Sequence, residues 1–341
     1  MPKVVAVIPS LGRNIDRLNR AIGSIRNTSS EPELQIVVVN NSHSDLTQKA
    51  VGADRILNPG LNLGYVGALE WVRQSLTSDY LWVVQDDMTV TNDVLGTLMT
   101  RMEADENLAV LSPLLVRDGI VPARTRAGVF IDSTKTTWEN VPFADTAIED
   151  WEPIHDLMFV SGSGALYRST ALAAVGGFDV SLFPLMHVDV DLCWRLTEAG
   201  YRIDLCPEAH IEHEIQGSTP RMLGELLFEL NTKIVARKMA GNPETTAPPE
   251  YSINPEIVKK IATKAASLVI DLAQRGDALV LERDSLIAER DSLIAERDEI
   301  RAHRDSLSAE RDLLLASTSW RVTRPLRGLK NRVALLRRRH K

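Results

Sequence analysis

The stretch Leu81-Trp82-Val83-Val84-Gln85-Asp86-Asp87 decides the fold, because a run of four apolar residues ends in an acidic turn. Such a run predicts a buried strand. In open α/β sheets, ligands collect at the carboxyl ends of the strands. Two adjacent carboxylates at such an end are placed where a cation carrying phosphates can be held, and Mg²⁺ or Mn²⁺ takes such oxygen ligands. An isolated Asp-Asp pair also fits a solvated turn, so the other motifs decide between the two interpretations.

The first 110 residues alternate between strand and helix patterns. Residues 4–8 are apolar and mostly β-branched, residues 35–39 are a second predicted strand, and residues 56–57 are a candidate short third strand. Between the strands, apolar residues recur at helical spacing, first over residues 15–25 and again over residues 66–76. This alternation predicts an α/β fold, with a mostly parallel sheet flanked by helices on both faces.

The middle of the chain has weaker patterns. Residues 113–157 are rich in Asp, Thr, Pro and Arg, which predicts loops with short strands. A strand is expected at residues 158–160, a helix at residues 191–198 with Gly200 as its terminator, and another strand at residues 201–205.

The C-terminal third has a different organisation. Residues 241–255 contain four prolines and predict a linker between a domain of residues 1–240 and a helical region of residues 256–316. From Glu282 a seven-residue unit repeats five times, which implies a left-handed coiled coil. If the repeated leucine or isoleucine is placed at heptad position d, arginine occupies every position a. The helix–helix seam is then imperfect, because a two-stranded coiled coil favours an apolar residue at position a. A weak dimeric coil is preferred over a lone solvated helix, since the repeat's charges lack good partners within one helix.

Charge and composition narrow the function classes. The net charge is −7, but residues 317–341 carry nine Lys or Arg and no acid, leaving 30 basic against 46 acidic residues elsewhere. This basic tail suits an anionic membrane surface better than nucleic acid, because only Trp320 can stack on a base. Two cysteines make neither a disulfide framework nor a zinc site. No apolar run reaches transmembrane length, and we expect a cytoplasmic protein, peripheral on the inner membrane face.

Further clusters of polar residues follow the predicted strands. Asn40, Asn41 and Asp45 offer donors and acceptors for a base or ribose, although turn chemistry favours the same residue types. Asn62 and Gly64 lie in the sequence NLGYVG, where glycine permits either close approach to a phosphate or a turn.

A second acidic segment, MHVDVDLCWR at residues 186–195, precedes a helical stripe. Asp189 and Asp191 fit the first turn of a helix, where the macrodipole favours negative charge. Alternatively, one of these carboxylates removes a proton from an acceptor hydroxyl. Downstream, His210 and His213 fall on opposite faces of an alternating segment, and one of the two imidazoles is a candidate to complete the coordination of a cation beside Asp87, although a lone histidine is more often a surface residue.

The ordered motifs together resemble the family-2 inverting glycosyltransferases of the GT-A fold, over roughly residues 3–240. The matching segments are VIPS at 7–10, IVVVNNSHSDLT at 36–47, NLGYVGA at 62–68, VVQDD at 83–87, VSGSGALYR at 160–168 and VDVDLCWRLTEAGYRI at 188–203. The tail at residues 319–327 is similar to the C-termini of bacterial polysaccharide glycosyltransferases, including rhamnosyltransferase-like proteins.

The resemblance implies roles for individual residues. Asp189 matches the general base, and Asp87 and His213 match the ligands of a divalent cation, Mg²⁺ or Mn²⁺. On the acceptor side it implies Gly162, Arg195 and Asp191, the last either contacting the acceptor or structural. The residues implied in nucleotide-sugar binding are Pro9, Asn40, Asn41, Asp45, Asn62, Gly64, Gln85 and Asp86.

The chain departs from the family's pattern at three positions: Gln85 replaces an acid of the triplet, Val188 the Glu before the base, and Asn40 an Asp. The function implied is transfer of a sugar from a nucleotide-diphospho-sugar to a glycan or lipid-linked acceptor in bacterial cell-wall polysaccharide biosynthesis. The alternatives are a decayed, membrane-associated coiled-coil scaffold and a sugar nucleotidyltransferase. The latter favours a glycine-rich basic loop after the first strand, where Ser10-Leu11-Gly12-Arg13 has one glycine.

Overall fold

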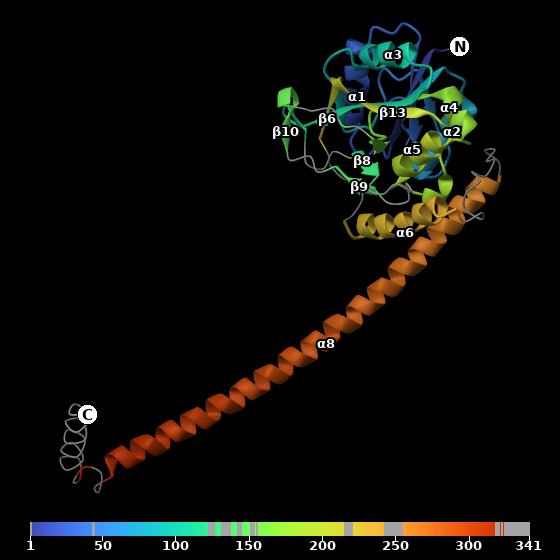
Figure 1. Ribbon diagram of the computed structural model, residues 1–341. Helices are drawn as coiled ribbons and strands as arrows, with labels where there is room; N and C mark the ends of the chain where they lie inside the picture. The colour runs from blue at the N-terminus through green and yellow to red at the C-terminus, as the bar shows by residue number, and fades with distance from the viewer. Residues whose placement is uncertain are drawn as a thin grey trace. The chain divides into compact units, whose positions relative to one another are not determined.

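The computed structural model describes residues 2–42, 45–121, 127–130, 138–141, 145–150, 154, 156–214, 221–241, 255–317, 321 and 323. Contacts between residues divide the chain into two units, Met1–Leu268 and Val269–Lys341. In the first unit, strands and helices alternate around one large sheet (Figure 1). The second unit, as far as it is described, consists mainly of the long helix that begins at Pro255.

Eight strands form the large sheet: β1 (Val4–Ser10), β2 (Leu34–Asn40), β3 (Arg55–Leu57), β4 (Tyr80–Val83), β5 (Met88–Val90), β6 (Leu108–Val116), β12 (Leu166–Arg168) and β13 (Arg202–His213). Two small sheets hold β7 (Ile120–Val121) with β10 (Thr146–Ala147), and β8 (Ala127–Phe130) with β9 (Trp138–Asn140) and β11 (Leu157–Val160). The helices are α1 (Ile15–Thr28), α2 (Gly64–Ser75), α3 (Val94–Ala104), α4 (Ser169–Ala174), α5 (Val188–Glu198), α6 (Arg221–Met239) and α8 (Pro255–Ala316), with 3₁₀ turns at Ile148–Asp150 and Val180–Leu182.

The strand order of the large sheet is β3-β2-β1-β4-β12-β6-β13-β5. Strands β3, β2, β1 and β4 are parallel, as are β6 and β13, whereas β12 and β5 run antiparallel to their neighbours. Ser10 lies opposite Asn40 in the register of β1 and β2, and Val7 lies opposite Val83 in that of β1 and β4. The carboxyl ends of these strands therefore form one continuous edge.

Alternation along the strands builds two apolar layers. In β1, Val5 and Val7 face the layer that contains α2, α4 and α5, while Val4, Ala6 and Ile8 face the layer that contains α1 and α3. All five of these β1 side chains are fully buried. Because both faces are covered, the strands read as continuous apolar runs in the sequence.

The predicted α/β class with a mostly parallel, helix-flanked sheet is confirmed, and the first three predicted strands and two predicted helices match β1 to β3, α1 and α2 within a few residues. The helix expected at residues 191–198 begins earlier, at Val188. Residues 113–157, predicted as loops with short strands, begin with the end of β6, which continues to Val116, and contain the short strands β7 to β10. The strand expected at residues 201–205 extends to His213 as β13, with a register shift between Cys206 and His210.

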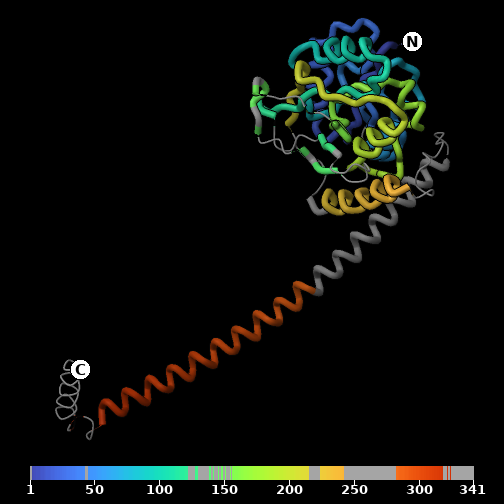
Figure 2. Tube along the Cα trace, in the orientation of Figure 1, coloured from blue at the N-terminus to red at the C-terminus, as the bar shows by residue number. Residues whose placement is uncertain are grey.

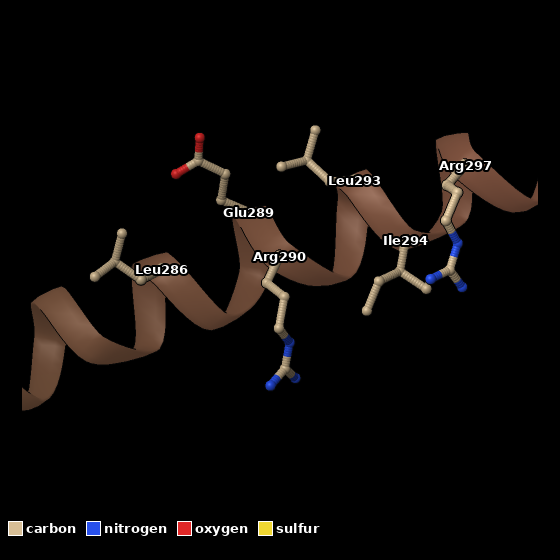
Figure 3. A pocket seen from close by; sticks show the side chains of 6 residues that line it. All are labelled: Leu286, Glu289, Arg290, Leu293, Ile294 and Arg297. Atoms are coloured by element: carbon tan, nitrogen blue, oxygen red, sulfur yellow. The ribbon is translucent and has the colours of Figure 1, made fainter.

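Helix α8 joins the predicted amphipathic and heptad segments into a single helix, which Figure 2 traces over residues 282–316. Its leucines at position d stay open to solvent, with Leu286 and Leu293 each 59% exposed. Leu286, Glu289 and Leu293 extend to one side of the helix, and Arg290 and Arg297 extend to the other (Figure 3).

The expectation that the charges of the heptads lack partners within one helix is wrong. Each repeated arginine forms an ion pair with the aspartate that follows it, at 2.7–2.8 Å, from Arg283–Asp284 to Arg311–Asp312. The sequence reasoning considered only pairs one helical turn apart and missed these adjacent ones. All ten side chains are more than half exposed, so such pairs contribute little to stability.

Of the predicted linker, only Gly241 and the helical residue Pro255 are described, and most of the predicted basic tail at residues 317–341 likewise lies outside the described residues. The domain limits at residues 240, 255 and 316 stay predictions. Among the helices that the structure describes, none combines the length and apolarity needed to cross a bilayer.

Candidate functional site

The acidic turn after β4 meets the ends of two other elements. The Asp86 carboxylate accepts hydrogen bonds from the Ser10 hydroxyl at 2.7 Å and from the Arg17 guanidinium at 2.9 Å. Ser10 ends β1, and Arg17 lies in the first turn of α1. The nearly buried guanidinium of Arg17 therefore neutralises Asp86. This pairing agrees with a place for Asp86 beside the candidate site of a divalent cation and not among its direct ligands.

Asp87 points instead toward the end of β13. Its Oδ1 lies 3.3 Å from Nε2 of His213, and both side chains are 12% exposed. The two atoms are close but do not form a hydrogen bond: Asp87 Oδ1 is buried and has no hydrogen-bond partner among the described residues. Burial alone would raise the pKa of Asp87, but the His213 ring, with a smaller effect from Arg17, outweighs it and lowers that pKa.

A carboxylate oxygen without a partner beside an imidazole nitrogen fits a divalent cation. Mn²⁺ accepts both ligand types, whereas Mg²⁺ favours oxygen. No cluster of three His, Cys, Asp or Glu side chains able to hold a metal ion occurs in the described part of the chain. Asp87 and His213 therefore suit a cation that completes its coordination with substrate phosphates and water.

Gln85, where an acid was expected, ties this turn to the segment after β11. Its side-chain amide donates to the hydroxyl of Ser163 at 2.8 Å. The neighbouring Gly162 N–H donates to Oδ2 of Asp189 at 3.3 Å. Asp189 lies in the first turn of α5 and is only partly buried. A short path through Gly162, Ser163 and Gln85 thus connects the candidate base with the acidic turn.

Space at Gly162 is limited. A Cβ there would lie 2.9 Å from the hydroxyl of Tyr167 and 3.4 Å from Cβ of Asp189. Tyr65 donates a hydrogen bond to the Gly162 carbonyl at 3.4 Å. Burial first, and the nearby Asp189 charge second, raise the pKa of Tyr65, which keeps its phenol protonated as a donor.

Asp191 and Arg195 do not lie on an open surface. The Asp191 side chain is 0% exposed; one oxygen binds Arg195 at 2.7 Å and the other binds Lys238 at 2.6 Å. Arg195 also donates to the carbonyls of Val175 and Gly177. Burial of both side chains disfavours a direct contact with an acceptor, and of the two roles considered for Asp191 the geometry favours the structural one.

The predicted nucleotide residues form a hydrogen-bonded turn. The buried Asn41 amide donates to the carbonyl of Gly64 at 2.8 Å and accepts from the N–H of Leu63 at 3.0 Å. Asn62 Oδ1 accepts from the Gly64 N–H at 2.8 Å. Gly64 has φ +64° and no room for a Cβ, which would lie 2.8 Å from the backbone of Pro184. Gly64 is therefore required by the turn and by the close approach of the Pro184 backbone, and the approach to a phosphate stays a prediction.

The remaining nucleotide residues lie at the same end of the sheet. Asn40, at the end of β2, donates to Asn58 at 2.8 Å. Asp45 is exposed and accepts from the N–H of Thr47 at 2.8 Å; the Thr47 hydroxyl first, and this N–H second, lower the pKa of Asp45. Pro9 is partly buried in β1. Sequence reasoning missed Arg17, Tyr65 and Lys238; polar residues on otherwise amphipathic helices gave no signal for them.

Comparison with known proteins identifies the family. Residues 5–176 match the family described as Glycosyl transferase family 2, which is just over half of the chain. The chain belongs to this family. The candidate base lies beyond the matched residues, as does all of α6.

Two relatives from Mycobacterium tuberculosis are each 27% identical. One is a pre-mycofactocin glycosyltransferase, matched over 62% of this chain and 42% of its own length, so the chain spans less than half of that relative. The other is an N-acetylglucosaminyl-diphospho-decaprenol L-rhamnosyltransferase, matched over 64% of this chain and 77% of its own length.

Among solved structures, GalNAc-T7 with UDP, GalNAc and Mn²⁺ superposes with a TM-score of 0.53 at 14% identity. The superposition covers 78% of this chain and 55% of the other. At this identity it shows a common fold, and the fold is GT-A.

We predict that Gly162→Ala lowers both stability and turnover. The new methyl group must displace the buried Tyr167 hydroxyl or the Asp189 side chain, and overpacking of this kind costs about 1–3 kcal/mol. Urea denaturation and initial rates measure the two effects. The matched control is Gly23→Ala within α1, where nothing lies within 4 Å of the new methyl group. It should leave turnover unchanged and stabilise the fold by about 0.5–1 kcal/mol. Equal behaviour of the two variants would contradict the tight packing at Gly162.

Proposed function

We propose that this chain is an inverting glycosyltransferase that moves a sugar from a nucleotide-diphospho-sugar to a hydroxyl of a glycan or lipid-linked acceptor, in bacterial cell-surface polysaccharide synthesis. The observation that carries the proposal is the path from Asp189 through Gly162 and Gln85 to Asp87. It brings a candidate base and a candidate cation site to one edge of the sheet.

In the proposed reaction, Asp189 accepts the proton of the acceptor hydroxyl as its oxygen attacks the anomeric carbon. The bond from that carbon to the diphosphate breaks on the opposite face, and the nucleoside diphosphate leaves with the electron pair. The anomeric configuration therefore inverts. A divalent cation held by Asp87 and His213 would neutralise charge on the departing diphosphate. Asp189 is suited to its role because it is only partly buried; its Oδ2 accepts a backbone hydrogen bond from Gly162, and its Oδ1 accepts one from Val190.

Rhamnose is the first donor sugar to test, because one relative is named as an L-rhamnosyltransferase that acts on a lipid-linked sugar. The same name supports a diphospho-lipid-linked acceptor. A cation is supported by the unpartnered Asp87 oxygen and by the Mn²⁺ that accompanies UDP in the superposed GalNAc-T7 structure.

Asp189→Asn should abolish most turnover. Incubated with UDP-, GDP- and dTDP-sugars and a lipid-linked acceptor, the wild-type protein should release nucleoside diphosphate, and the variant should be slower by about 10²–10⁴-fold. Donor binding should change little, because the substitution is nearly isosteric. Release that never exceeds buffer would favour the scaffold alternative, and pyrophosphate formation would favour the nucleotidyltransferase.

Asp191→Asn provides the control for this assignment. The Asp191 oxygens bind Arg195 and Lys238 inside the protein. The variant should therefore lower the free energy of unfolding more than the rate of the chemical step. A folded Asp191→Asn protein without activity, beside an active Asp189→Asn protein, would show that the base is Asp191.

His213→Ala and Asp87→Ala should weaken Mn²⁺ binding in the presence of nucleoside diphosphate. Loss of a residue that only supports a ligand costs about 10–100-fold in metal affinity, so loss of the ligand itself should cost at least about tenfold. Calorimetric titration of Mn²⁺ measures it. His210→Ala, three residues earlier in β13, is the matched control and should bind like wild type. Full turnover in excess chelator would contradict the cation proposal.

We further propose that the C-terminal third dimerises the enzyme and holds it on the cytoplasmic membrane face. Five exposed d positions supply a continuous apolar stripe: Leu286, Leu293, Ile300, Leu307 and Leu314. The nine basic residues that follow position 316 can each contribute up to about 1 kcal/mol near an anionic surface. This placement would put the enzyme beside a lipid-linked acceptor.

Truncation after Met239 should lower the mass measured by light scattering from that of two full chains to that of one shortened chain and abolish binding to phosphatidylserine vesicles at low salt, while activity on a soluble acceptor persists. In the full chain, Leu293→Asp with Ile300→Asp should also yield a monomer, because the charges fall on the apolar stripe. Ala295→Asp with Ala302→Asp, at the outward position f, is the matched control and should remain dimeric. A wild-type monomer that stays off vesicles would overturn both parts of the proposal.

A further inference from the structure

Helix α6 makes several polar contacts with the chain segment that leads into the candidate base. Asn231 is fully buried, and its side-chain nitrogen lies within hydrogen-bond distance of three carbonyl oxygens: Leu182 at 3.0 Å, Leu185 at 2.8 Å and Met186 at 3.0 Å. An amide nitrogen carries two N–H donors, so three carbonyls share them. The carbonyls also fix which end of the amide faces the segment, because oxygen in that place would repel all three.

The residues that Asn231 holds have an unfavourable backbone. Met186 and His187 are consecutive non-glycine residues in the left-handed region, with φ of +76° and +60°. L-residues reach this region at a cost, and they persist there where the surrounding structure over-determines them. The hydrogen bond to the Met186 carbonyl restrains this pair directly.

The strained pair sets the start of α5. His187 is the N-cap residue, and its carbonyl accepts the first helical bond from the N–H of Asp191 at 3.0 Å. Asp189 lies two residues after His187, in the same turn. The direction in which Asp189 points therefore depends on the conformation of residues 186–187.

Three more residues of α6 restrain the same region. The Thr232 hydroxyl lies 3.1 Å from Nε2 of His187, and the Phe228 ring lies edge-on to the His187 ring at 4.5 Å. Further along the helix, the buried Lys238 binds Asp191 and Asp179. Asn231 and Lys238 are seven residues apart and so lie on one face of α6.

We propose that Asn231 is a positioning residue: it holds the backbone of residues 182–187 so that Asp189 meets the Gly162 N–H and faces the acceptor hydroxyl. Lys238 stabilises the same turn of α5 through its ion pair with Asp191. Helix α6 is thus part of the catalytic unit, although it lies outside the residues that match the family. The role given to Asp189 in this inference rests on the proposed function, whereas the contacts of Asn231 do not depend on it.

The test compares Asn231→Ala and the isosteric Asn231→Asp with Lys233→Ala, an exposed residue of the same helix, all in the full chain. The donor is whichever the wild-type protein turns over among UDP-glucose, UDP-galactose, GDP-mannose and dTDP-rhamnose. We expect kcat to fall at least about tenfold in both Asn231 variants, with donor affinity within about twofold of wild type. Displacement of a reacting group by about 1 Å can cost about 10²-fold.

Hydrogen exchange of the amides at residues 186–191 gives a readout that does not need activity. It should become at least about tenfold faster in the Asn231 variants and stay unchanged in Lys233→Ala. Wild-type kcat, unchanged exchange, or a parallel loss of donor affinity would overturn the proposal, as would rates that recover fully once the folded fraction is corrected for. If Asn231→Ala does not fold, Asn231→Asp decides. A wild-type protein inactive on every donor would refute the proposed function, and the exchange result would still decide whether Asn231 holds the turn.

Discussion

A buried group of four charges beneath the first turn of α5 is the constraint on which the candidate site depends. Lys238 forms ion pairs with both Asp179 and Asp191. Arg195 forms an ion pair with the other carboxylate oxygen of Asp191. Removing charges from water is costly, so such a group is stable only when every charge is paired. Burial alone would raise the pKa of Asp179, but Lys238 outweighs it and lowers that pKa, which keeps Asp179 ionised. Loss of one member leaves a buried charge unpaired, with a typical cost of about 3–5 kcal/mol.

This charge group explains why two carboxylates so close in sequence differ in function. Asp189 and Asp191 lie in the same helical turn, yet Asp191 faces the interior and Asp189 faces Gly162. Residues two apart on a helix point about 200° from one another, so only one of them can face the ion pairs. The buried partner fixes the rotation of α5, and that rotation leaves the other carboxylate at the open edge of the sheet.

The sequence predicted most of the first half of the fold, because the strands and helices of that half are defined by patterns within short stretches of sequence. Apolar periodicity and short connections identified β1 to β4, α1 and α2, and strand polarity placed Asp86 and Asp87 at the carboxyl edge. It also paired Asp87 with His213, although more than 120 residues separate them, and this came from the family resemblance. Periodicity carries no information on which strand neighbours another across such a distance.

What the sequence could not predict was the pairing of individual polar side chains. Arg17 is one polar residue on an amphipathic helix until the fold brings it to Asp86, and Lys238 has no signal until α6 covers α5. The same limit applies to Asp191 and Arg195, which the sequence placed on the acceptor side. Four residues apart on one helix, they already form a local ion pair, and the carbonyls of Val175 and Gly177 that bury Arg195 come from a loop with no regular pattern.

The pairing of Arg17 with Asp86 also changes the meaning of the substituted acidic triplet. With Gln85 neutral and Asp86 paired, Asp87 is the carboxylate of the triplet that keeps an oxygen without a hydrogen-bond partner among the described residues, with only the His213 ring beside it. A divalent cation here would meet one negative ligand and one neutral imidazole, so most of the charge that holds it must come from the diphosphate. Cation and donor are therefore expected to bind together, each strengthening the other by the same factor, because linkage between two sites is reciprocal. On this argument, a neutral Gln85 would make the cation a component of the bound donor and not a resident of the protein.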